Sequence, residues 1–259
     1  SRRRKVARQN SCRGNITEDV KTAEEISKAA AVRFGTIGMS VFRFPLLNKK
    51  NISDYVVIQG KEKLDEILAS GEGCIIAGNH CGNWELEGAA LALYGYPILA
   101  VGMKQSNEGF DKFIREYRSI PGQTVEYKTG VRDMLRRLKE GYFVGLLCDQ
   151  DPGDTGLISP FLGQKTLTPT GPAHFALMTG RPVFMAFMHQ LTDYTYEIIV
   201  EDPIYADKNL GKKESVRQIT DDINKRLGNW IKKHPEDWFW LHNRSKWTDR
   251  FYPELKEES

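Results

Sequence analysis

The residues from Gly73 to Gly88 (GCIIAGNHCGNWELEG) constrain the fold more than any other stretch of the chain. Within them Cys74–Ala77 is a short apolar run after a glycine, which predicts a buried and parallel strand. A polar, turn-prone segment follows, and apolar side chains then recur at helical spacing, at Leu86, Ala89, Ala90 and Leu93. The stretch is therefore predicted to form a strand, a loop and a helix. His80 falls just past the carboxyl end of the strand, where α/β sheets place their ligands.

His80 and Glu85 have the chemistry of a general base and its orienting acid. Glu85 falls in the first turn of the predicted helix, where the dipole favours a carboxylate, and Gly82 lets the loop fold tightly enough for the two side chains to meet. A carboxylate that accepts one ring N–H fixes the tautomer and leaves the other nitrogen free to take a proton. The alternative is that His80 only caps the helix and Glu85 is an ordinary first-turn acid.

The rest of the chain alternates between strand and helix patterns, which predicts an α/β fold. No repeat or long linker divides the chain, so we expect a single domain with a mixed, mostly parallel sheet flanked by helices. Residues 1–50 are expected to be helical and membrane-proximal, and residues 51–259 to form the catalytic core. Strands are expected at 73–79, 96–101, 124–127, 142–148, 182–189 and 196–200, the last two as an antiparallel pair, and helices at 17–47, 61–70, 84–94, 107–118, 131–139, 170–179 and 214–233.

Composition and cysteine spacing indicate the size of the core and the state of the thiols. With 259 residues, 40% of them hydrophobic, the chain can bury a sizeable core. Its four cysteines lack the spacing of a metal site, and two of them lie in strand-like runs, which favours buried, reduced thiols. No apolar run approaches the roughly 18 residues of a membrane span. The chain opens on SRRRK without a Met, so we expect residues, including a membrane anchor, to have preceded it.

Two N-terminal segments suggest contact with a membrane. Ser1–Arg13 carries six Lys or Arg residues and no acid, so it suits phosphate in lipid or nucleic acid, or a solvated basic arm. Gly35–Leu47 is rich in apolar side chains and is expected either to join the core or to lie on lipid.

Several catalytic classes are excluded by missing motifs. The chain has no Gly-x-Ser-x-Gly elbow, no Walker loop, no dinucleotide fingerprint and no His-Glu-x-x-His. Cys81 is the one nucleophile beside His80, but adjacent residues on a turn rarely point toward one another. The chemistry expected is that of a base without a covalent nucleophile.

Two further segments resemble parts of a site. Asp149, Gln150 and Asp151 follow a predicted buried strand, so this loop can orient His80 or a substrate hydroxyl; the alternative is an Asx-turn. Trp238–Arg244 is aromatic and ends in a cation, so it can wall an apolar site or anchor the C-terminal part of the core.

Taken together, these segments resemble a known enzyme family. The His-x4-Glu pattern in GNHCGNWELEGA is similar to the His-x4-(Asp/Glu) motif of glycerolipid acyltransferases. LLCDQDPGDTG, PFLGQKTLTPTGPAHFALMTGRPV and DWFWLHNRSKW resemble, in the same order, segments of the late acyltransferases of lipid A biosynthesis and of the phosphatidylinositol mannoside acyltransferases. The match runs from about Arg2 to Trp247, and it implies a glycerolipid-acyltransferase-like fold.

The resemblance implies a role for individual residues. His80 would be the base and Glu85 its partner, and an Arg beyond the second helix would match Arg118, with Arg115 as its rival. The Asp149–Asp151 loop matches a segment close to the family's active site. The residues expected to contact substrate are Asn83, Arg115, Lys128, Asp149, Gln150, Asp151 and Thr170.

The resemblance also implies the reaction. A fatty acyl group would pass from a thioester of acyl carrier protein or coenzyme A to a hydroxyl of a lipid A precursor or related membrane lipid, without cofactor or metal. The expected place is the cytoplasmic face of a bacterial inner membrane, on an anionic surface and without nucleic acid. Alternatives are a lysophospholipid or phosphatidylinositol-mannoside acceptor, or a non-enzymatic basic module that binds membrane or nucleic acid. The basic side chains suited to an acidic partner are Lys104, Lys112, Arg115, Arg132, Arg136 and Arg137.

Overall fold

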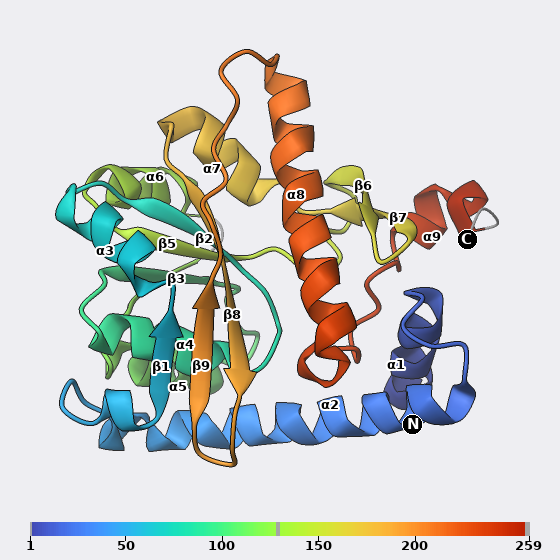
Figure 1. The fold of residues 1–259 in the computed structure, drawn as a ribbon, viewed down its shortest axis with the longest axis horizontal. Helices are drawn as coiled ribbons and strands as arrows, with labels where there is room; N and C mark the ends of the chain where they lie inside the picture. The colour runs from blue at the N-terminus through green and yellow to red at the C-terminus, as the bar shows by residue number, and fades with distance from the viewer. Residues whose placement is uncertain (1, 128–129, 257–259) are drawn as a thin grey trace.

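A seven-stranded sheet runs through the middle of the molecule (Figure 1). The computed structural model describes residues 2–127 and 130–256. The sheet has the order β1-β9-β8-β2-β5-β3-β4, and all of its neighbouring pairs are parallel except β8 and β9. The expected single-domain α/β fold with a mixed, mostly parallel sheet is confirmed. The strands of this sheet are β1 (Val56–Gln59), β2 (Cys74–Gly78), β3 (Ile98–Gly102), β4 (Thr124–Tyr127), β5 (Phe143–Leu147), β8 (Val183–Gln190) and β9 (Tyr196–Val200).

Strand β2 is central because it is apolar on both faces. All five of its residues are buried. Cys74 and Ile76 join the apolar cluster on one face of the sheet, and Ile75 and Ala77 join the cluster on the other. Burial of each large aliphatic side chain contributes about 1.5–3 kcal/mol, so a strand of this composition is most stable between two covered faces.

Helices cover both faces of the sheet. One face packs against α6 (Val131–Lys139), α7 (Gly171–Thr179) and α8 (Lys212–Lys233). The other packs against α3 (Lys61–Ala69), α4 (Trp84–Leu93) and the 3-10 helix η1 (Val41–Leu46). The remaining helical segments are α5 (Glu108–Ser119), η2 (Ile52–Asp54), η3 (Pro235–Asp237), α9 (Thr248–Phe251) and η4 (Pro253–Lys256).

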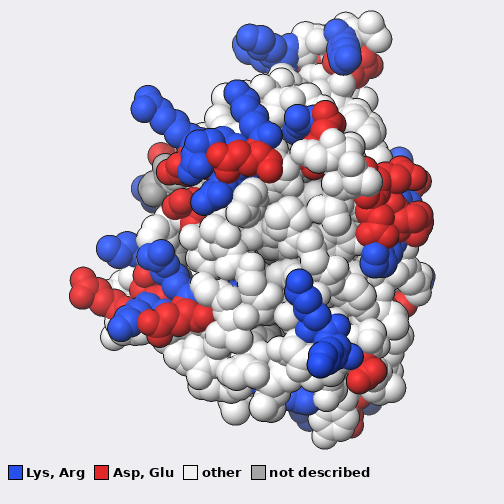
Figure 2. All heavy atoms as spheres, turned by 90° about the vertical axis from the view of Figure 1, so that its left-hand side faces the viewer, with Lys and Arg blue, Asp and Glu red and all other residues white. Residues whose placement is uncertain are grey.

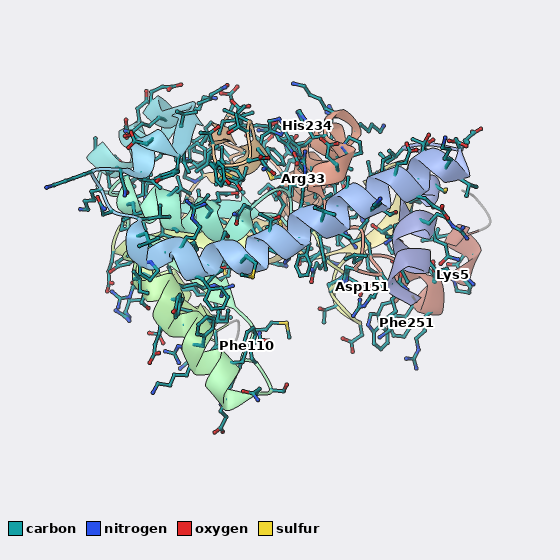
Figure 3. All side chains as sticks on the ribbon, turned by 90° about the horizontal axis from the view of Figure 1, so that it is seen from below. Lys5, Arg33, Phe110, Asp151, His234 and Phe251 are labelled. Carbon is teal, nitrogen blue, oxygen red and sulfur yellow. The ribbon has the colours of Figure 1, made fainter. Side chains whose placement is uncertain are left out.

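The N-terminal part is helical, and the basic segment is not a free arm. It forms α1 (Arg2–Arg13), in which Ala7 and Ser11 are buried. The Asn10 amide donates to the carbonyl oxygens of Trp240 (2.9 Å) and His242 (2.7 Å), which fixes α1 to the C-terminal segment. Helix α2 (Val20–Ser40) then crosses the whole underside of the molecule (Figure 3).

The N-cap of α2 is Asp19, two residues beyond Thr17, where the helix was expected to begin. The Asp19 carboxylate accepts the backbone N–H of Thr22 at 2.8 Å. Thr17 lies further out, where its hydroxyl accepts the backbone N–H of Asp19 at 3.1 Å. Both residue types can cap a helix, so the pattern alone did not distinguish them.

The apolar stretch 35–47 divides between core and surface. Val41 and Phe44 are buried, whereas Met39, Phe42 and Leu46 are 66%, 54% and 68% exposed. Neither expected alternative therefore describes the whole stretch. Among the described residues, no helix combines the length and the apolar character needed to cross a membrane.

Three strands were not predicted. Strand β1 lies at the sheet edge beside β9, and β6 (Leu157–Phe161) pairs antiparallel with β7 (Gln164–Thr168) in a separate hairpin. Pro160 lies within β6, where a proline argues against a strand assignment. In the hairpin turn Leu162 has a φ of +49°, a conformation that the sequence pattern does not predict for a leucine.

Candidate active site

Parallel pairing of β2 with β5 brings His80 and Asp149 together. Gly78 at the end of β2 is in register with Leu147 at the end of β5, so the loops that follow begin side by side. His80 follows the first strand and Asp149 the second. The His80 Nδ1 atom lies 2.7 Å from Asp149 Oδ1.

Asp149 is held by three donors and is almost fully buried, with 1% of its side chain exposed. Besides the His80 ring, its Oδ2 atom accepts the backbone N–H of His80 (2.9 Å) and the indole N–H of Trp238 (2.8 Å). Burial opposes ionisation, but attraction to the protonated form of the His80 ring and these hydrogen bonds outweigh it and lower the Asp149 pKa to about 2. Asp149 is thus a carboxylate at any physiological pH.

This geometry fixes the tautomer of His80. A carboxylate at Nδ1 keeps the proton on that nitrogen, so Nε2 carries the lone pair that can accept a proton. The amide nitrogen of Gln150 lies 3.4 Å from Nε2. The predicted pairing of His80 with Glu85 is wrong, and the alternative that the Asp149–Asp151 loop orients His80 is correct for Asp149.

Glu85 instead pairs with Arg118. The guanidinium donates from Nε to Oε2 (2.9 Å) and from Nη2 to Oε1 (2.6 Å), a bidentate arrangement. Only 20% of the Arg118 side chain and 14% of the Glu85 side chain are exposed. The residue before Glu85, Trp84, packs its ring edge-on against the His80 imidazole, with centroids 4.8 Å apart.

The loop between β2 and α4 is fixed by backbone contacts. Gly82 has a φ of +57°, and a Cβ there would collide with the carbonyl oxygen of Met188, so both the conformation and the space require glycine. The Gly82 N–H donates to the Asp237 carbonyl (2.9 Å), and the Phe239 N–H donates to the His80 carbonyl (3.0 Å). His80 is therefore held from both sides of the loop.

Aromatic rings wall the space around His80. Phe239 and Trp84 lie near its ring, with centroid distances of 6.2 and 4.8 Å, and Phe34 of α2 packs against Phe239 at 4.5 Å. Such rings exclude water and suit an apolar substrate. The proposed aromatic wall from the C-terminal segment is thus present at Phe239.

An apolar pocket opens beside this cluster. Asn79, Trp84, Glu85 and Arg118 contribute to its lining, together with aliphatic side chains of α4, β3 and β5. Glu87 also lines it, and burial raises the Glu87 pKa to about 8. At neutral pH the Glu87 side chain is therefore largely uncharged.

Cys81 is not placed to act as a nucleophile. Its side chain is fully buried in the core. Burial raises the pKa of the thiol well above its usual value, and the charge of Asp149 adds to this effect. A thiol that stays protonated is a poor nucleophile, in agreement with the prediction from its position.

Asn83 and Asp151 hold the backbone. Asn83 is buried, and its carbonyl oxygen caps α4 by accepting the Leu86 N–H at 3.1 Å. Asp151 accepts the N–H groups of Gly153 and Trp247, both at 2.9 Å, so it forms the alternative Asx-turn and anchors the C-terminal segment. Their predicted substrate contacts stay predictions that this geometry does not favour.

Within the described part of the chain, Arg115 and Thr170 form no hydrogen bond with His80 or Asp149. Arg115 donates to the Tyr127 hydroxyl (3.1 Å) and lines an open pocket with Lys104 and Lys112. Thr170 precedes α7 and, among the described residues, makes no side-chain hydrogen bond to the His80 cluster. Lys128 lies outside the described residues.

Three of the six predicted basic side chains form ion pairs within their own helix or with its C-cap residue. Lys112 pairs with Glu116, and Arg136 and Arg137 both pair with Glu140. Figure 2 shows basic and acidic side chains mixed around a broad uncharged area on the face that it draws. These three side chains are therefore neutralised on the helix surface, and a continuous basic field is not seen on that face.

Sequence reasoning did not identify Trp238 as a partner of Asp149. The aromatic composition of Trp238–Arg244 correctly indicated that this segment is important, but it did not distinguish a wall of the site from an anchor of the core. It does both, because Arg244 is buried and donates to the Leu167 carbonyl and to the Thr168 hydroxyl (2.9 Å). Burial lowers the Arg244 pKa to about 10.

Comparison with known proteins identifies the family. The sequence profile described as "Bacterial lipid A biosynthesis acyltransferase" matches residues 1–247. The chain belongs to this acyltransferase family. It is therefore an enzyme, and the interpretation as a binding module without catalysis is set aside.

Named relatives fall into two groups. The chain is 27% identical over 221 residues to the "Phosphatidylinositol mannoside acyltransferase" of Mycobacterium tuberculosis (strain CDC 1551 / Oshkosh), covering 82% of this chain and 68% of the relative. It is 22% identical over 251 residues to the "Lipid A biosynthesis palmitoleoyltransferase" of Escherichia coli (strain K12), covering 95% and 79%. The family resemblance expected from the sequence motifs is confirmed.

Proposed function

We propose that this acyltransferase moves a fatty acyl group directly from a thioester, on acyl carrier protein or coenzyme A, to a hydroxyl of a lipid A precursor or related membrane lipid. His80 would act as general base and Asp149 as the residue that orients it. The observation that carries the proposal is the 2.7 Å contact of His80 Nδ1 with a buried carboxylate, which directs Nε2 away from Asp149.

Each step then has an assigned group. Nε2 of His80 removes the proton of the acceptor hydroxyl while the oxygen attacks the thioester carbonyl. The tetrahedral intermediate collapses, the C–S bond breaks, and the leaving thiolate takes the proton from the imidazolium. No acyl-enzyme forms, in keeping with the buried thiol of Cys81.

Arg118 is the proposed electrostatic partner of the substrate. Its two hydrogen bonds to Glu85 use Nε and Nη2. The remaining Nη1 group is then available to a lipid phosphate or to the oxyanion that develops at the carbonyl. Glu85 would act by holding the guanidinium at the mouth of the apolar pocket that both residues line.

The membrane surface is the proposed place of reaction, at the cytoplasmic face of a bacterial inner membrane. Met39, Phe42 and Leu46 expose apolar side chains at the end of α2 and in η1. Phe42 packs against Phe113 of α5, on which Phe110 is 52% exposed. Figure 3 shows α2 and Phe110 on the same underside, so these side chains can enter a lipid surface together, at about 25 cal/mol per Å² buried.

The choice of acceptor separates two candidate functions. The 27% identity to a phosphatidylinositol mannoside acyltransferase favours a glycosylated phospholipid acceptor as the second candidate. We expect transfer to one acceptor class to exceed transfer to the others when lipid A precursors, phosphatidylinositol mannosides and lysophospholipids are presented in equal vesicles. Each acceptor should be tested with acyl carrier protein and coenzyme A thioesters of graded chain length.

The control for this assay is the His80→Ala variant, tested with each donor and acceptor combination that the unmodified protein uses. Transfer to a lysophospholipid alone would overturn the proposed lipid A class acceptor. Transfer that is unchanged in a folded His80→Ala protein would overturn the proposed base.

A further inference from the structure

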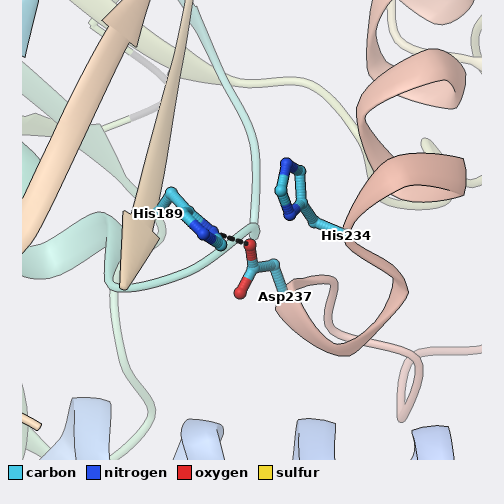
Figure 4. Close-up of side chains that lie close together, drawn as sticks. All are labelled: His189, His234 and Asp237. Atoms are coloured by element: carbon cyan, nitrogen blue, oxygen red, sulfur yellow. Dashed lines mark hydrogen bonds and ion pairs between the residues drawn. The ribbon is translucent and has the colours of Figure 1, made fainter. Parts of the chain in front are cut away.

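A second cluster of ligating side chains lies behind the active-site loop. His189 is the second-to-last residue of β8, His234 directly follows α8, and Asp237 is the last residue of η3. One donor atom of each residue lies within 4.8 Å of the other two. The closest pair is His189 Nδ1 and Asp237 Oδ2, 3.0 Å apart (Figure 4).

We propose that His189, His234 and Asp237 form a binding site for a divalent transition metal ion, with Zn²⁺ as the best match. Two imidazoles and one carboxylate are a donor set that Zn²⁺ uses, with a fourth position left to water. Mg²⁺ and Ca²⁺ prefer oxygen donors, so two histidines disfavour them.

The spacing is compatible with such an ion after a small movement. Bonds of roughly 2.0–2.2 Å place neighbouring donors on one ion roughly 3–3.5 Å apart. The His189–Asp237 pair already has this separation. His234 must close the remaining gap, and it is a partly exposed side chain at the C-terminal end of α8, where rotation of the ring is possible.

The charges around the cluster also tolerate a cation. Arg33 and Lys233 supply positive charge, and Asp237, Glu236 and Glu197 supply negative charge. Arg33 forms its ion pair with the Oδ1 atom of Asp237, so the Oδ2 atom remains on the histidine side. Figure 3 shows Arg33 of α2 close to His234.

The two imidazoles lie beside one another, with ring centroids 4.3 Å apart. Trp230 packs beside both rings, with its ring centroid 6.0 Å from His189 and 4.5 Å from His234.

An ion at this site would reinforce the active-site loop. The Asp237 carbonyl accepts the Gly82 N–H, and the next residue, Trp238, donates to Asp149. The ion would join the ends of β8 and α8 to the segment that holds His80 and its partner. Its role would be structural, since none of its three ligands contacts His80.

The test is metal binding by the full chain. After treatment with a chelator, the protein is titrated with ZnCl₂ against a chromophoric indicator, with MgCl₂ in parallel, in a Cys12→Ser background that removes the one cysteine that is not buried. We expect a single Zn²⁺ per chain and none of Mg²⁺. His234→Ala should weaken binding by roughly tenfold or more.

The matched control is His174→Ala, since His174 is an exposed histidine on α7, away from the cluster. It should leave Zn²⁺ affinity unchanged. Equal loss in both variants, or no binding to the unmodified chain, would overturn the proposal.

A second measurement avoids dependence on the variants' folding. Co²⁺ added to the unmodified chain should give ligand-field absorption without a thiolate charge-transfer band. A thiolate band would show that a cysteine holds the metal, and would equally contradict the site.

Discussion

Asp149→Asn should inactivate the enzyme by reversing the tautomer of His80. In the structure the carboxylate accepts three donors: Oδ1 takes the His80 ring N–H, and Oδ2 takes the His80 backbone N–H and the Trp238 indole N–H. An asparagine has the same shape but one acceptor oxygen and one NH₂ group. It can therefore satisfy only one side of this arrangement.

The size of the fall in kcat depends on which N–H donors the oxygen of the new asparagine accepts from. If the amide oxygen faced the ring, the two other N–H donors would lose their acceptor, at a cost of about 2–6 kcal/mol together. The amide therefore places its oxygen toward those two donors and its NH₂ toward Nδ1. The ring must then accept at Nδ1 and carry its proton on Nε2, which removes the base, so kcat should fall by about 10²–10⁴-fold.

The assay combines kcat with a direct measurement of the tautomer. Nitrogen-15 NMR of histidine side chains should show the neutral His80 proton on Nδ1 in the unmodified protein and on Nε2 in Asp149→Asn. Asp151→Asn is the matched control, because Asp151 lies in the same loop and its side chain accepts, from the residues that the structure describes, the backbone N–H groups of Gly153 and Trp247. It should keep most of kcat.

Near-normal kcat in folded Asp149→Asn would refute this reasoning. So would a proton that remains on Nδ1, because the tautomer would then not depend on Asp149. Loss of activity with an unchanged tautomer would assign Asp149 a role other than orienting the base.

Three further changes have defined outcomes. Arg118→Lys loses the bidentate contact with Glu85, so chemical denaturation should show an unfolding free energy lower by about 1–3 kcal/mol, and transfer should fall as well. Cys81→Ala should retain transfer activity, and mass spectrometry should find no acylated protein. The Asp149 pKa is lowered from 3.8 to about 2, so the ionised carboxylate contributes about 2 kcal/mol to the free energy of unfolding above pH 4, and this contribution is lost as the pH falls toward 2. Measurements of unfolding free energy against pH should show that Asp149→Asn lacks this acid dependence.

Elements with a strong local signal were predictable from the sequence. Val131–Lys139 and Thr124–Tyr127 have the bounds that periodicity and flanking glycines indicated. The basic segment at α1 was not predicted as a packed helix, because its stability comes from contacts with residues 240 and 242, far along the chain. Its own composition gives no such signal.

The site was predictable where it depended on local order. His80 follows a strand and precedes a helix, and that order places it at the sheet edge. Its partner Asp149 lies 69 residues away in the chain. The pairing of β2 with β5 brings it beside His80, and residue spacing in the sequence does not predict that pairing. Glu85 was nearer in sequence, but Trp84 occupies the space beside His80 and Glu85 turns to Arg118.

The central claim is that His80 accepts the proton of a lipid hydroxyl during direct acyl transfer. The most direct test is single-turnover transfer from a thioester donor to a lipid acceptor by the unmodified protein and by His80→Ala, with circular dichroism to confirm the fold. We expect the variant to bind both substrates but to transfer the acyl group about 10²–10⁴-fold more slowly. Transfer at an unchanged rate by folded His80→Ala would contradict it.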